Sequence, residues 1–235
     1  MTRLLIYFLT FVIGACCASF LTVCAWRWPL GLSITWPGSR CDFCHHALAW
    51  YDLCPIISYL ILRGHCRYCD TRIQHHFFTS EVIGGLLACC LASQYFIPQI
   101  GYLLLILYLL SLVDIFHTAL YPVPMVLAFM PLFIDYWPTN HWLSALLIGS
   151  TLSAINYFSD GIGTGDIELL EILGLWFGLE VTLSMLLIAC LLCLIKYLID
   201  SLRHPVVLAL VGHRPIPFVP YISYGVLIVL FIVNT

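Results

Sequence analysis

The sequence predicts an all-α polytopic integral membrane protein, with about eight transmembrane helices and a zinc-knuckle cytoplasmic loop. Hydrophobic residues make up 62% of the 235 residues and charged residues 9%, whereas soluble domains average about 45–50% and about 25%. The apolar stretches are continuous and close to the bilayer length of about 20 helical residues, unlike the alternating strands of a transmembrane β-barrel. Two C-x-x-C pairs lie in the one long polar stretch.

The composition also excludes several classes of protein. Twenty-one acidic and basic side chains are too few to cover a water-soluble enzyme of this length. A disordered protein would be far more polar, and a nucleic-acid binder would be far more basic. We therefore expect the lipid bilayer to be a partner of this chain, and we expect no nucleic acid.

Eight apolar stretches are predicted to span the membrane. The first continues through Ala25 to Arg27, beyond the apolar core of about 7–15 residues in a signal peptide, so we expect an uncleaved helix. The third and sixth stretches are short, and they are expected to be tilted or sunk within the bundle. The predicted spans are 4–26, 82–98, 101–114, 120–137, 142–158, 167–179, 182–199 and 218–233.

The basic residues predict the orientation. Eight of the nine Lys and Arg residues lie in or beside two segments, the loop 27–80 and the connection before the last span. The positive-inside rule places both segments in the cytoplasm. With eight spans, both termini are then expected outside.

The two cysteine pairs predict a metal site. Cys41 and Cys44 are followed, after twenty-one residues, by Cys66 and Cys69. Paired knuckles at this spacing match a tetrahedral four-thiolate zinc site, and a reducing cytosol favours thiolates over disulfides. Two disulfides or reactive thiols are the alternatives. Cys54 lies between the pairs, and the other seven cysteines lie in apolar runs, where they behave as small hydrophobes.

Two acidic residues are predicted to lie at one depth. Asp114 ends the third predicted span and Asp166 begins the sixth, so the predicted topology places both at the cytoplasmic face. Taken singly, Asp166 could be the N-cap of a helix from Ile167, and Asp114 could mark a helix end. Two neighbouring carboxyl groups do not easily both ionise, so a close pair provides a general acid and a general base that activate water against a peptide carbonyl.

These residues belong to a series of motifs that extends along nearly the whole chain. They are Ala18–Val23 with Arg27 and Pro29, Ser39–His45, Trp50–Leu60, Leu62–Cys69, Ile73, Glu81, Ser111–Asp114, Gly163–Asp166 and Pro217–Tyr221. Their order and spacing resemble those of the type IV prepilin leader peptidases, a family of GxGD-type membrane aspartyl proteases. Ala18 and Thr22 replace the glycine and asparagine usual in that family, and Glu168 replaces a lysine.

This resemblance implies a bifunctional enzyme of the bacterial cytoplasmic membrane. It would cut the leader from type IV prepilins or pseudopilins at the cytoplasmic face, and then N-methylate the new N-terminal residue with S-adenosylmethionine as methyl donor. The implied catalytic residues are Asp114 and Asp166, with Gly163 and Gly165 in the catalytic loop; Glu81 and Arg27 are methyltransferase candidates. The implied domains are a first transmembrane helix (1–26), a zinc-binding cytoplasmic loop (27–80) and a polytopic aspartyl peptidase domain (81–235).

Two other functional classes fit parts of the sequence. A membrane thiol oxidoreductase would use the C-x-x-C pairs, but such chemistry needs an exposed thiolate, usually on the oxidising side of the membrane. An ion or metal transporter would use Asp114 and Asp166 as ligands, but transporters place such groups near the midplane and contain internal repeats. Neither feature is recognisable here.

Overall fold

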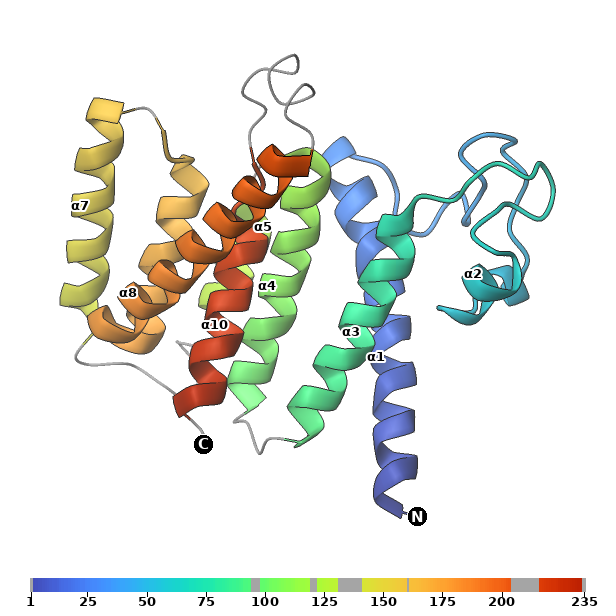
Figure 1. The fold of residues 1–235 in the computed structure, drawn as a ribbon, viewed down its shortest axis with the longest axis horizontal. Coiled ribbons are helices and arrows are strands. Elements are labelled where there is room, and N and C mark those ends of the chain that lie inside the picture. The colour runs from blue at the N-terminus through green and yellow to red at the C-terminus, as the bar shows by residue number, and fades with distance from the viewer. Residues whose placement is uncertain are drawn as a thin grey trace. The chain divides into compact units, whose positions relative to one another are not determined.

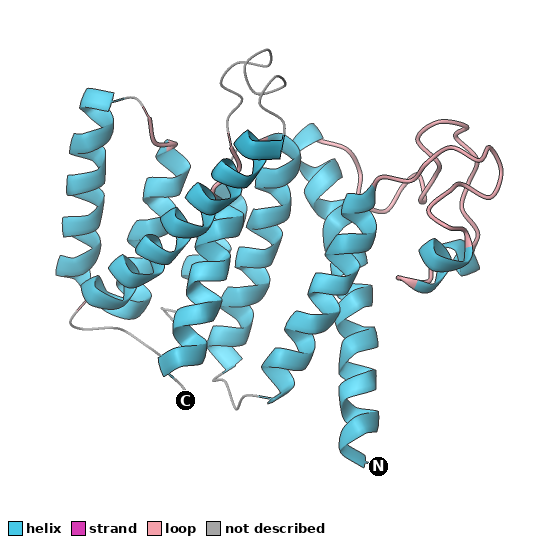
Figure 2. Ribbon diagram, in the orientation of Figure 1, coloured by secondary structure: helices cyan, strands magenta, loops and turns pink. Residues whose placement is uncertain are grey.

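In a computed structural model of the chain, the residues described are 2–93, 98–118, 122–130, 141–159, 161–203 and 216–233. Within these ranges the regular structure is helical, and pairing of extended backbone is limited to two isolated bridges, Arg40–Ala47 and His65–Arg72. Figure 2 shows the helices with their connecting loops. The chain forms two compact units, residues 1–101 and 102–235.

The first unit is built on two helices packed side by side, α1 (Thr2–Arg27) and α3 (His75–Ser93) (Figure 1). Their interface consists of small residues four apart, Gly14 and Ala18 on α1 against Gly84 and Ala88 on α3. A Cβ atom on Gly14 would lie 2.6 Å from the Gly84 carbonyl oxygen. Small residues let two backbones approach this closely, which is a common way for helices to associate in a bilayer.

A polar contact closes the same interface near the end of α1. The buried hydroxyl oxygens of Thr22 and Ser80 lie 2.9 Å apart. Because each hydroxyl also reaches a backbone carbonyl of its own helix, neither is left without a partner in apolar surroundings. The unit therefore combines close backbone packing with one satisfied polar pair.

A loop module connects α1 to α3 in the first unit. It contains the short 3₁₀ helices η1 (Trp28–Leu30) and η2 (Trp50–Leu53), the short helix α2 (Ile57–Ile61) and both cysteine pairs. The bridge Arg40–Ala47 closes one cysteine pair, and His65–Arg72 closes the other.

The second unit is built around α4 (Pro98–His117), which is buried on most of its surface between Leu103 and Asp114. The other helices of the unit are α5 (Pro122–Phe129), α7 (Trp142–Ser159), α8 (Thr164–Arg203) and α10 (Val219–Val233). α8 packs against both α7 and α10. At the α10 contact, a Cβ atom on Gly225 would lie 2.5 Å from the Met185 carbonyl oxygen.

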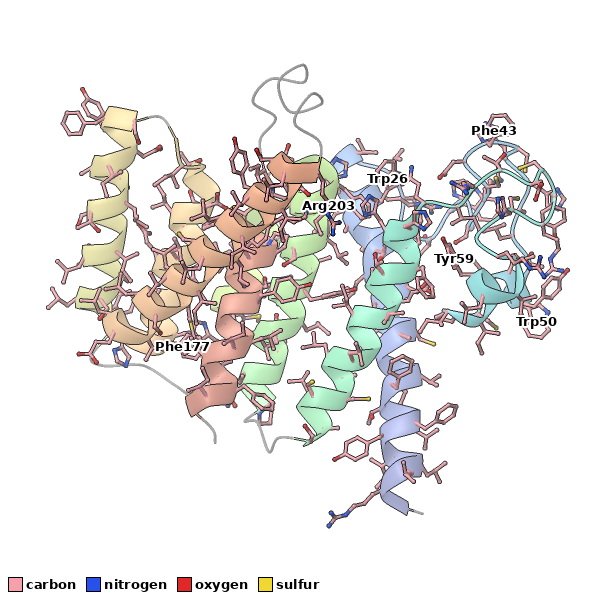
Figure 3. The ribbon with its side chains drawn as sticks, viewed as in Figure 1. Trp26, Phe43, Trp50, Tyr59, Phe177 and Arg203 are labelled. Atoms are coloured by element: carbon pink, nitrogen blue, oxygen red, sulfur yellow. The ribbon has the colours of Figure 1, made fainter. Side chains whose placement is uncertain are left out.

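α8 is interrupted at Gly178, whose φ of +79° and ψ of +176° are not helical. Residues with a side chain rarely adopt this backbone conformation, whereas glycine adopts it readily. Figure 1 shows α8 running to this point and turning back on itself, and Figure 3 marks the neighbouring Phe177 at the turn. The interruption falls at the end of the sixth predicted span.

Within the described ranges, four helices are long and apolar enough to cross a membrane: α1 with η1, α3, α4 and α8. α10 is a shorter apolar helix. The described part of every predicted span is helical except for Met130 and Phe218, but the expected number of eight is not confirmed. Much of the predicted span 120–137, residues 94–97 of the second, and most of the basic connection before α10 lie outside the described residues.

Candidate active site and metal centre

Asp114 lies on α4 one turn before its end, and its side chain is almost completely buried. Its Oδ2 atom accepts a hydrogen bond of 3.0 Å from the Val219 N–H, in the first turn of α10. The Phe218 backbone adds a second interaction with the same carboxyl group. The N-terminus of a helix has free N–H groups and a positive dipole end, so it compensates a carboxylate in apolar surroundings.

Asp166 is the third residue of α8, in its first turn. The helix begins at Thr164, so the interpretation of Asp166 as the N-cap of a helix from Ile167 is wrong. The Gly163 carbonyl accepts hydrogen bonds from the backbone N–H groups of Asp166 and Ile167, at 3.1 and 3.3 Å. A Cβ atom on Gly163 would lie 3.2 Å from Asp166 Oδ2, so the missing side chain leaves room for the carboxyl group. Gly165 is the second residue of the helix.

The loop before α8 is also attached to α7. The Ile162 N–H donates a hydrogen bond of 2.9 Å to the side-chain oxygen of Asn156. This contact fixes the Gly161–Gly163 segment from which Asp166 emerges. Asn156 was not among the candidates from sequence, because a single asparagine within an apolar stretch forms no motif that would indicate its partner.

The two aspartates belong to the same unit, and the charge of Asp114 acts on the carboxyl group of Asp166. Fifty-two residues separate them in the sequence, so the packing of α4, α8 and α10 brings them within electrostatic reach. One turn before Asp114, Ser111 Oγ lies 2.7 Å from Ser223 Oγ of α10. This second contact holds α4 and α10 in register, and it was not predicted.

The four cysteines of the two pairs converge in the loop module. The Sγ atoms of Cys41, Cys44, Cys66 and Cys69 all lie within 4.8 Å of one another, and those of Cys41 and Cys69 are 3.7 Å apart. Tetrahedral zinc with Zn–S bonds of about 2.3 Å separates its sulfurs by about 3.8 Å. None of the twelve cysteines of the chain forms a disulfide. The donor set and its spacing therefore fit a zinc ion.

The two knuckles have the same backbone form. In each, the first cysteine's carbonyl accepts an N–H from the residue four positions on, His45 in one knuckle and Asp70 in the other, and both of these residues have a positive φ. The Thr71 hydroxyl lies 3.2 Å from Cys69 Sγ, and hydrogen bonding from Thr71 lowers the pKa of this thiol to about 6. A thiol that ionises readily is suited to bind a metal ion.

An ion pair in the loop module was not singled out from sequence. Arg67 Nε donates to Asp52 Oδ1 at 2.8 Å, and the Asp52 side chain is only 3% exposed. The guanidinium group also lies over the Tyr51 ring, 5.0 Å from its centroid. The pair connects η2 to the second knuckle. Both residues lie inside the predicted motifs, but the sequence does not indicate that they meet.

The two methyltransferase candidates both hold the loop module against the helices. Glu81 Oε2 accepts a hydrogen bond of 2.7 Å from the Ile56 N–H, and the Ser19 side chain bonds to the same carboxyl group. Arg27 donates from Nη1 to three backbone carbonyls, which belong to Ser33, Ile34 and Pro37 at 3.2, 3.4 and 2.8 Å. These contacts give both residues a structural role, and their part in methyl transfer stays a prediction.

Comparison with known proteins connects both units to one family. The sequence model of the bacterial peptidase A24 N-terminal domain matches residues 12–95, and that of the type IV leader peptidase family matches residues 101–198. No solved structure matches the chain.

Curated relatives are named "Prepilin leader peptidase/N-methyltransferase". The protein of Bacillus subtilis is 26% identical over 92% of this chain and 90% of its own length. That of Burkholderia pseudomallei (strain 1026b) is 27% identical over 91% and 81%. The Myxococcus xanthus protein is 47% identical over 77 residues, which are 33% of this chain and 23% of its own. This chain therefore belongs to the type IV leader peptidase family.

Proposed function

We propose that this protein removes the leader peptide of type IV prepilins or pseudopilins at the cytoplasmic face of the bacterial cytoplasmic membrane, and that Asp114 and Asp166 perform the cleavage. The observation that carries the proposal is the approach of these two carboxyl groups within one unit of a leader peptidase family member. Glycine at position 163 and the α10 N-terminus beside Asp114 provide the setting that such a pair needs.

The proposed cleavage follows the chemistry of a carboxyl pair that shares one proton. The ionised carboxylate takes a proton from a water molecule, and the water oxygen attacks the carbonyl carbon of the scissile bond. The protonated carboxyl group gives its proton to the carbonyl oxygen. When the tetrahedral intermediate collapses, the C–N bond breaks and the leaving amine takes up a proton. The products are the free leader and a pilin with a new N-terminal amine.

N-methylation of that amine, with S-adenosylmethionine as the donor, is the second part of the proposal. It is supported by the match of the N-terminal domain model and by the names of the relatives. We assign zinc to Cys41, Cys44, Cys66 and Cys69, where the bound ion would cross-link the two knuckles. With all four thiols gathered in one metal-type cluster, a thiol oxidoreductase is the less favoured alternative.

Mass spectrometry of a co-expressed prepilin tests both activities together. We expect the leader to be lost and the new N-terminal residue to gain one methyl group, and we expect neither change in cells that carry the empty vector. An uncut prepilin would contradict the peptidase assignment. A cut but unmethylated pilin would contradict only the methyltransferase assignment.

A further inference from the structure

One apolar surface of the loop module is unexplained by the metal site or by packing within the protein. In η2 and α2 the Asp52 side chain is buried in its ion pair, but no residue is buried as a whole. Five large apolar side chains of these two helices are exposed: Trp50 by 79%, Leu53 by 45%, Ile57 by 61%, Leu60 by 61% and Ile61 by 69%. We call these five residues the Trp50–Ile61 surface. Several large apolar side chains exposed on one short segment indicate a contact with a membrane or another protein.

The hydrogen bonds of this segment place it beside the helices rather than beyond their ends. Ile56 is bonded to Glu81, which lies six residues into α3, or about 9 Å along the helix axis. Glu81 is bonded in turn to Ser19, eight residues before the end of α1, or about 12 Å. Since α1 and α3 are both long and apolar enough to span a bilayer, these contacts lie beside helical segments that would cross it.

A further contact attaches α2 to the start of α3. Tyr59 of α2 donates to or accepts from His75 Nδ1 at 2.8 Å and stacks on Phe78, both in the first turn of α3. Figure 1 shows α2 level with part of α3 and set apart from it. Figure 3 shows Trp50 and Phe43 at opposite ends of the module.

The charges of the segment suit a lipid environment. Its one charged side chain between residues 50 and 61 is Asp52, which is paired with Arg67 and almost completely buried. The exposed Arg63 lies two residues after the end of α2. A long basic side chain at the edge of an apolar surface can extend to anionic headgroups while its neighbours contact acyl chains.

We propose that the Trp50–Ile61 segment is embedded in the membrane leaflet at the C-terminal end of α1, and that the Trp50–Ile61 surface contacts lipid acyl chains. The occupant is lipid because the apolar, exposed flank of α1 continues at the same depth, with Ile13 and Phe20 exposed by 62% and 58%. The loop between α1 and α3 is then a membrane-anchored module and not wholly a water-exposed one. This proposal does not depend on the catalytic assignment.

Tryptophan quenching in proteoliposomes of phosphatidylethanolamine and phosphatidylglycerol tests the proposal. The difference in emission between the wild type and Trp50→Phe reports on Trp50. The matched control is Phe43→Trp, because Phe43 is 72% exposed at the other end of the module. We expect phospholipids with brominated acyl chains to remove most of the Trp50 emission, and aqueous iodide to remove most of the emission of the tryptophan added at position 43.

Two results would overturn the proposal. Quenching of Trp50 by iodide but not by brominated lipid would place the surface in water. Protection of Trp50 from both quenchers would mean that a second copy or another protein segment covers it. As an independent variant, Ile57→Asp should reduce lipid quenching of Trp50, whereas Phe43→Asp should leave it unchanged; equal effects of the two would also contradict the proposal.

Discussion

At the scale of single residues, Asp114 has two properties that must be separated. Its carboxylate accepts the Val219 N–H and so stabilises the start of α10, and we propose that it also takes part in proton transfer. Asparagine keeps an oxygen that can accept this hydrogen bond but has no acid–base capacity. Substitution by asparagine therefore removes the proposed catalytic property and retains the structural one.

Gly163 allows a prediction about the position of the second carboxyl group. In Gly163→Ala, the new Cβ would lie 3.2 Å from Asp166 Oδ2, so the carboxyl group must shift by a few tenths of an ångström. Because small displacements of reacting groups are costly, we expect the rate of prepilin cleavage to fall by about tenfold. The matched control is Gly161→Ala, whose Cβ would meet nothing closer than 3.8 Å. Equal cleavage rates for the two variants would show that crowding at Gly163 is irrelevant.

At the scale of elements, the α1–α3 interface depends on backbone contact. A Cβ atom on Gly84 would overlap the Ala18 side chain and lie 3.1 Å from the Gly14 carbonyl oxygen. We expect Gly84→Ala to lower the free energy of unfolding by about 1–3 kcal/mol, as overpacking does, and to lower Tm in a thermal unfolding assay. Gly101→Ala, where a Cβ meets nothing within 4 Å, should leave Tm unchanged or raise it. A Tm for Gly84→Ala equal to that of the wild type would contradict close helix packing.

The loop module should depend on its metal ion for order. Cys41→Ser removes one of four thiolates that lie within 4.8 Å of one another, so we expect zinc content to fall and the segment between α1 and α3 to become sensitive to limited proteolysis, because metal binding and folding are coupled in such sites. Cys54→Ser, in the same loop but outside the cluster, should keep its zinc. Full zinc occupancy after replacement of all four cysteines would refute the assignment.

Elements were predictable from sequence where one chemical signal was sufficient. The C-x-x-C spacing led to the four cysteines whose sulfur atoms cluster in the structure, because knuckle geometry is local and repeats in both pairs. The interruption of α8 at Gly178 lies close to the predicted end of a span at residue 179. Glycine is the residue that most readily adopts the positive φ found there. The start of α8 at Thr164 was missed because a run of glycines does not indicate which residue caps the helix.

At the scale of the whole molecule, the distribution of basic residues predicts the side of the membrane on which the loop module lies. Four of the nine Lys and Arg residues lie between residues 40 and 72, so the positive-inside rule predicts a cytoplasmic position. We expect a reporter fused at Phe43, an exposed residue, to be active only in the cytoplasm. A fusion at this point that is active only outside the cell would reverse the predicted orientation.

Contacts between distant segments could not be predicted from sequence. The family motifs indicated Asp114 and Asp166 as candidate catalytic residues. They did not indicate the hydrogen bond between Asp114 and the α10 N-terminus, or the Ser111–Ser223 contact beside it. These depend on how α4 and α10 pack, and apolar helices of similar composition give no signal for choosing partners. The depth of the Trp50–Ile61 surface was missed for a related reason, because it depends on the bond between Ile56 and Glu81.

The most direct test of the central claim is the cleavage rate of a prepilin by purified Asp114→Asn and Asp166→Asn variants in proteoliposomes. General acid–base groups contribute about 10²–10⁴-fold, so we predict that each variant is folded and loses at least about 100-fold in rate. Glu168→Ala, which changes an exposed carboxylate in the same first turns of α8, should lose far less. A folded Asp114→Asn variant that cuts prepilin at the wild-type rate would show that Asp114 only stabilises α10, and the proposed aspartate pair would be wrong.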